Sequence, residues 1–150
     1  MRRAWMPALI LAAGCGGGDT STPEGFVRAW FADYKVPQHE LRMDHGLATA
    51  EWQLKIEEAK AGWLTDEARR LHDIEKQRES IEFARDNLTE LKQIEIHVIS
   101  VTEKGDDASV TYRTFTREPA PDGDDWKMTD VWSEPESVTL KKAGGAWKID

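Results

Sequence analysis

Cys15 has the most distinctive chemistry in this sequence, because it is the only thiol among 150 residues. Residues 4–13 form an uncharged run behind the basic start at residues 1–3. This pattern is typical of a secretion signal, and the run is shorter than the about 20 residues that a membrane-spanning helix needs. The small pair Ala13-Gly14 stands directly before Cys15, where a signal peptidase requires small side chains. The spacing therefore predicts an exported chain.

The sequence LAAGC, residues 11–15, also resembles the lipobox of bacterial lipoproteins, with alanine where the commonest pattern has its leucine. In that family the cysteine carries a lipid and the chain is cut just before it. The resemblance therefore implies lipidation of Cys15. It also implies recognition by the signal peptidase at four residues: Leu11, Ala12, Ala13 and Gly14. Several acyl chains anchor a protein stably, whereas one chain is only marginal.

Histidine and aspartate side chains invite a metal hypothesis at five positions: His39, Asp44, His45, His72 and Asp73. No pair of them has a metal-binding spacing on one helix face, so we expect solvated or capping roles. The acidic stretch Asp122-Gly123-Asp124-Asp125 lacks the alternating acids and closing glutamate of a calcium loop, and a solvated turn is the favoured interpretation. We therefore predict no metal and no cofactor.

Composition restricts the class of partner. The formal net charge is −8, and removal of residues 1–14 would leave 18 basic and 28 acidic residues, a net charge of −10. Such a chain repels phosphate backbones and anionic lipid headgroups, so nucleic-acid binding is not expected. Six of the seven tryptophans follow the signal, which indicates a packed domain. We expect a signal peptide at 1–14, a lipidated cysteine and flexible tether at 15–22, and one domain at 23–150.

Helical periodicity dominates the first half of that domain. Thr22 is a typical N-cap for a helix over residues 23–35, which Pro37 should end. Asp44 is placed to begin a second helix. This helix carries an apolar stripe at Trp52, Ile56, Ala59 and Trp63. Such a stripe is more often core than a partner-binding face. A third helix is expected from 66 to 93, with a stripe from Leu71 to Leu91.

The pattern then changes to the two-residue alternation of strands. We expect strands beginning at Ile94 and Ala108, with either a bulge or a strand end buried on both faces near Ile99. Residues 118–125 are predicted to be a long polar loop. A third strand is expected within 128–142, interrupted near Pro135, and a last short strand at 147–149. Helices followed by an antiparallel sheet of about four strands predict an α+β fold.

Three segments together resemble small bacterial lipoproteins with a nuclear-transport-factor-2-like, or cystatin-like, domain. They are TPEGFVRAWFADY, IEIHVISVTEKGDDASVTYRTF and SVTLKKAGGAWKID, at residues 22–34, 94–115 and 137–150. The resemblance implies an opening helix packed in the curve of the sheet. The helical middle, residues 44–93, is longer than that fold usually carries, so a helical hairpin packed on a small sheet is the rival architecture.

Some members of this wider superfamily are enzymes of the ketosteroid isomerase or SnoaL-like type, which use carboxylates in an apolar pocket. By that resemblance the candidate catalytic residues are Asp33, Tyr34, Tyr112 and Asp130. None lies in a distinguishing motif, so we predict a non-enzymatic envelope lipoprotein that binds a protein partner or ligand. A small-molecule pocket protein or isomerase-like enzyme is the alternative. Gly16 after the cysteine favours the outer membrane, facing the periplasm, by resemblance to outer-membrane lipoproteins.

Overall fold

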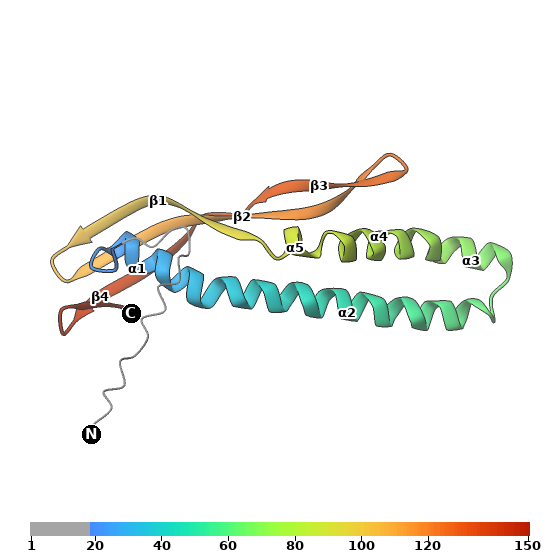
Figure 1. The fold of residues 1–150 in the computed structure, drawn as a ribbon, viewed down its shortest axis with the longest axis horizontal. Helices are drawn as coiled ribbons and strands as arrows, with labels where there is room; N and C mark the ends of the chain where they lie inside the picture. Colours follow the sequence, from blue (N-terminus) through green and yellow to red (C-terminus); the bar gives the residue numbers. More distant parts are fainter. Residues whose placement is uncertain (1–18) are drawn as a thin grey trace, which may run out of the picture.

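The computed structural model describes residues 19–150, apart from the side chains of Leu71 and His72. The predicted processing site at residues 11–15 lies outside this range. Within it the fold is α+β, as predicted: helices come first and an antiparallel sheet follows, with five strands where about four were expected. Figure 1 shows a long helical hairpin that extends from one end of the sheet.

The first helical stretch is continuous, and the prediction that Pro37 ends it is wrong. Helix α1 (Pro23–Trp30) passes through a π-helical turn, η1 (Phe31–Lys35), into α2 (Val36–Ala61). In that turn the Val36 N–H donates to the Phe31 carbonyl, five residues back. Pro37 therefore falls in the first turn of α2, where its missing N–H costs no helical hydrogen bond.

The chain then returns alongside α2 as three short helices, α3 (Asp66–His72), α4 (Ile74–Asp86) and α5 (Leu88–Leu91), which we call the return arm. A single helix was predicted here. Asp73 interrupts it with a left-handed backbone, at φ 44°. At the second break the Asn87 side chain donates to the Phe83 carbonyl at 2.8 Å, and so competes with the helical backbone. The predicted start of this helix at residue 66 is confirmed, and the Thr65 hydroxyl caps it by accepting from the Ala68 N–H.

The sheet comprises β1 (Ile94–Lys104), β2 (Asp107–Asp122), β3 (Asp125–Trp132), β4 (Glu136–Ala143) and β5 (Ala146–Ile149). Its order is β1-β2-β4-β5, with β3 also paired to β2. The register shifts between Val98 and Ser100, which places the predicted bulge at Ile99.

The predicted loop at 118–125 is wrong, because β2 continues to Asp122 and turns tightly into β3. Pro119 and Pro121 pair with Met128 and Trp126 in this hairpin. They are tolerated because this part of β2 has a strand partner on one side only. The expected third strand is accordingly two strands, β3 and β4, which separate at Pro135.

The core lies where α1 and η1 pack against the sheet. Its buried residues are Val27, Phe31, Ala108, Val110, Tyr112, Leu140 and Trp147. The Phe31 and Tyr112 rings meet edge to face, with centroids 6.1 Å apart. The indole N–H of Trp147 donates to the Ser21 carbonyl at 2.9 Å and so ties the last strand to the start of the domain. Aromatic side chains therefore fill the space between helix and sheet.

Tyr112 makes the stability of this core sensitive to high pH. Its ring is 1% exposed, and its hydroxyl donates to Glu136 Oε2 at 3.0 Å. Burial, and then the adjacent carboxylate, raises the pKa of Tyr112 from 10.0 to about 12. The neutral phenol thus contributes stability that is fully present below pH 10 and is lost as the pH rises towards 12.

We expect the free energy of unfolding to fall by about 2–3 kcal/mol between pH 9 and pH 12 through Tyr112 alone. Urea unfolding of Tyr112→Phe should lack this component. The matched control is Tyr34→Phe, because Tyr34 is the other tyrosine and is half exposed. If both variants lose stability with pH as the parent does, the ionisation of Tyr112 is not coupled to folding.

Candidate functional site

Ion pairs at regular spacing fix the helical hairpin. The three pairs are Asp44 Oδ1 with Lys92 Nζ at 2.7 Å, Glu51 Oε1 with Arg85 Nη2 at 2.6 Å, and Glu58 Oε1 with Arg78 Nη2 at 2.7 Å. The acids recur every seven residues along α2, and the bases recur every seven residues in the opposite direction. Seven residues are about two helical turns, so the three pairs form one ladder along an antiparallel hairpin. We call it the ion ladder.

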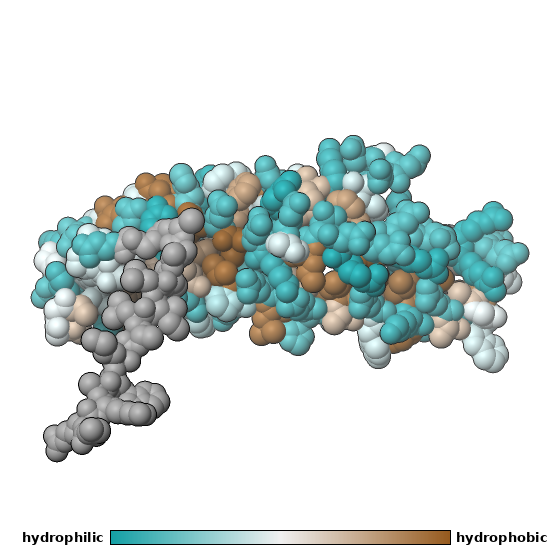
Figure 2. All heavy atoms as spheres, in the orientation of Figure 1, coloured by the Kyte–Doolittle hydropathy of each residue, from teal (hydrophilic) through white to brown (hydrophobic). Residues whose placement is uncertain are grey.

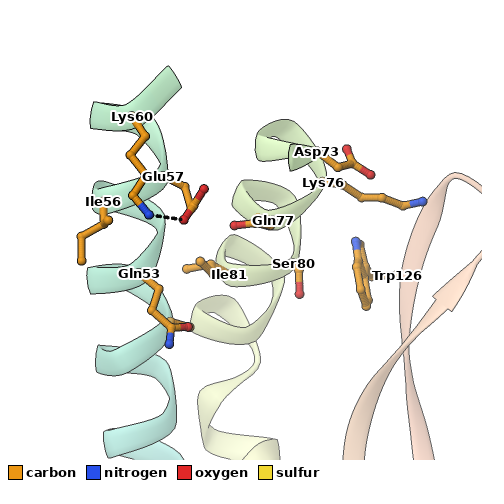
Figure 3. A pocket seen from close by; sticks show the side chains of 11 residues that line it. Gln53, Ile56, Glu57, Lys60, Asp73, Lys76, Gln77, Ser80, Ile81 and Trp126 are labelled. Carbon is orange, nitrogen blue, oxygen red and sulfur yellow. Dashed lines mark hydrogen bonds and ion pairs between the residues drawn. The ribbon is translucent and has the colours of Figure 1, made fainter. Parts of the chain in front are cut away.

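Apolar contacts and one buried hydrogen bond lie beside the ion ladder. Leu54 of α2 is 9% exposed, and Ile81 of α4 is similarly buried. Figure 3 shows the Ile81 side chain pointing towards α2. At the sheet end, His39 Nε2 lies 2.8 Å from the carbonyl oxygen of Leu91, the last residue of α5. Since a carbonyl only accepts, Nε2 carries the hydrogen, and His39 is a buried tie rather than a solvated residue.

The apolar stripe that the sequence placed in the core is exposed. Trp52 is 63% exposed, Trp63 is 92% exposed, and Leu41 on the same side is 59% exposed. At about 100° per residue, Trp52, Ile56 and Ala59 lie on the side of α2 opposite Leu54. A turn after the helix continues to Trp63, whose backbone N–H donates to the Lys60 carbonyl at 2.9 Å. We call Leu41, Trp52, Ile56, Ala59 and Trp63 the outer stripe.

The core prediction for this stripe fails for a physical reason. The return arm packs on the side of α2 that carries Leu54 and the acids of the ion ladder, and within residues 19–150 no other helix or strand covers the opposite side (Figure 1). Figure 3 shows Ile56 pointing away from α4. In Figure 2 the lower border of the molecule, where α2 lies, carries brown (hydrophobic) and white (intermediate) side chains, whereas the surface of the return arm is mainly teal (hydrophilic). The outer stripe is the candidate functional site.

Basic side chains flank the outer stripe. The helical period places Arg42, Lys55 and Lys60 on the outward half of α2, and all three are exposed. Lys60 also contacts Glu57 Oε1 at 3.4 Å. The other acids of α2 project by the same period towards the return arm, where three of them form the ion ladder. Acidic side chains of α2 therefore lie on the side that faces the return arm, and basic side chains lie on the outward side.

A second surface feature is a groove of about 840 Å³ between α2, α4 and the start of β3. Trp126 of β3 forms one wall, and its ring lies 6.5 Å from that of Phe83 (Figure 3). Gln53, Lys76 and Ser80 contribute polar groups. The groove is open to solvent and mixed in charge.

The residues nominated for catalysis do not come together. Asp33 and Tyr34 are exposed on η1, whereas Tyr112 lies in the core. Asp130 Oδ1 lies 3.3 Å from Arg117 Nε, on the β2–β3 hairpin. Within the part of the chain that the structure describes, only the sequence neighbours Asp33 and Tyr34 lie together, and no side-chain hydrogen bond or ion pair joins any two of the four.

The metal candidates are also dispersed. Asp44 belongs to the ion ladder, and His45 and Asp73 are exposed. Among the side chains that the structure describes, no three histidine, cysteine, aspartate or glutamate residues are grouped to hold a metal ion. No helix within residues 19–150 is long and apolar enough to cross a membrane.

The chain matches no protein-family model, no curated protein and no solved structure.

The buried tie at His39 predicts a measurable loss of stability. Replacing His39 by Ala leaves the Leu91 carbonyl without its partner, and we expect about 1–3 kcal/mol of destabilisation in urea unfolding. His45→Ala is the matched control, because His45 is exposed on the same helix. Equal stabilities of the two variants would contradict the tie.

Proposed function

We propose that this protein is a non-enzymatic lipoprotein of the bacterial cell envelope, anchored by lipid on Cys15, whose domain binds a partner through α2. The uncovered outer stripe is the observation that carries the binding function. The LAAGC sequence supports the anchor. Gly16 after the cysteine supports the outer membrane, with the domain facing the periplasm.

Isolated exposed apolar residues are normal on a protein surface, but an aligned set is not. The outer stripe places an exposed tryptophan and an exposed leucine on one side of α2, and a second exposed tryptophan, Trp63, follows two residues after the helix ends. That side is opposite the face that α2 already uses for packing. Tryptophan supplies a large apolar area and an N–H donor, and it is enriched in binding surfaces for that reason. The stripe therefore supports binding to a surface outside this domain.

The non-enzymatic part of the proposal is supported by the filled core. Phe31, Tyr112 and Trp147 occupy the side of the sheet where an isomerase-like pocket would lie. We also propose that the domain is related to nuclear-transport-factor-2-like, or cystatin-like, domains. The packing of α1 against β1 and β2 supports this relation, and α2, with 26 residues, is the main departure.

The anchor is tested by replacing Cys15 with Ala and separating membranes after a high-salt wash. The parent protein should stay in the membrane fraction, and the variant should be released, since it lacks the acyl chains. Gly17→Ala, two residues away, is the matched control and should stay bound. A Cys15→Ala protein that resists the wash as the parent does would refute the lipid anchor.

A further inference from the structure

We propose that the outer stripe of α2 docks on the surface of an anionic phospholipid bilayer, in the membrane that holds the Cys15 lipid. This inference rests on the proposed function and names the partner of the same site. The helix would lie in the plane of the membrane surface. Its tryptophans would sit at the level of the headgroups, and the ion ladder would face away from the bilayer.

The apolar geometry suits an interfacial helix. From Leu41 to Trp63 the outer stripe extends over about 33 Å at 1.5 Å per residue. Its side chains occupy one side of α2, and Trp52 and Trp63 are its most exposed members. Tryptophan prefers the interface between headgroups and acyl chains, because its ring is apolar and its N–H is polar. A helix of this kind lies on a membrane with its apolar side buried by about 5–10 Å.

Charge distinguishes a bilayer from other partners. Arg42 and Lys55 flank the outer stripe, and the helical period places no acidic residue of α2 on that side. Lys60 lies at the edge of this side, where it also lines the groove and contacts Glu57. The chain as a whole is acidic, with a net charge of −8, so this basic face is the one that an anionic surface would attract. A second copy paired antiparallel across Trp52 would instead bring Arg42 towards Lys60 of its partner, which is unfavourable.

The position of the proposed anchor limits how far the domain can move from the membrane. Cys15 precedes Asp19, the first described residue, by four positions. At most about 3.5 Å per residue separates them, so the start of the domain stays within about 14 Å of the lipidated cysteine. A tether of this length gives α2 a high effective concentration at the surface, and a weak docking face is then sufficient.

The experiment uses the full chain, purified from membranes with its lipid and reconstituted in vesicles of phosphatidylethanolamine and phosphatidylglycerol. Ala59→Cys, within the outer stripe, carries an environment-sensitive fluorophore. Acylated Cys15 does not react with the label. Asp124→Cys, in the exposed turn after β2, is the matched label position. Brominated lipids report contact with the bilayer, and flotation of the same sample reports the anchor.

We expect bromine to quench the probe at position 59 at least about twofold more than the probe at position 124, given the burial depth of an interfacial helix. Replacing both Trp52 and Trp63 by Ser should bring the two positions to the same level. Trp132→Ser is the control, because this tryptophan is half exposed but belongs to β3. Phosphatidylcholine vesicles, or 1 M salt, should also reduce the difference, because each weakens attraction to anionic headgroups.

Four results would overturn the proposal. Vesicles that float with equal quenching at the two positions would refute docking and leave the anchor intact. Undiminished docking on phosphatidylcholine would refute the role of anionic lipid. A probe at position 59 that is shielded from water without bromine quenching would show that a second copy or another protein covers the face. A protein that does not float would refute the proposed anchor, and the docking that rests on it.

Discussion

The register of the helical hairpin decides which side of α2 stays exposed, and that register is marked by the ion ladder. Its acids and bases recur every seven residues on two antiparallel helical segments, so only one register satisfies all three pairs. A shift by one residue would rotate each acid about 100° away from its partner. The acids of the ladder lie on the side of α2 that packs on the return arm, together with the buried Leu54 and His39. The opposite side, with its exposed tryptophan and leucine and its flanking bases, stays open to solvent.

The hairpin is joined to the sheet at two points, and these links fix its orientation relative to the sheet. The π-helical turn carries α1 into α2 without a break, and Phe31 of that turn is buried in the core. At the second point, His39 of α2 contacts the carbonyl oxygen of Leu91 at the end of α5, directly before β1. Trp147 closes the same core from the C-terminal strand. A displacement of α2 is therefore transmitted through these links to the core and the sheet.

Local patterns in the sequence predicted the α+β fold class, the cap at Thr22, the helix start at residue 66, and the bulge at Ile99. These predictions failed where contacts with residues distant in the sequence determine the local structure. Pro37 is tolerated because a π-helical turn shifts the hydrogen bonds before it, and residues 118–122 form a strand because β3 pairs with them. On α2 the spacing favoured burial of the tryptophans. The opposite side instead packs on the return arm, whose ladder bases lie 20 to 48 residues away in the sequence, and the pattern of a single helix does not contain that contact.

The register of the ion ladder is tested most directly by exchanging charges between its partners. Glu51→Arg and Arg85→Glu should each lower the melting temperature, because each puts like charges together. The double variant should recover most of the loss. Glu51→Arg combined with Arg78→Glu, one heptad out of register, is the matched control and should not recover it. This pattern would establish the register that turns the tryptophans outward. Equal recovery in both double variants, or single variants as stable as the parent, would contradict it.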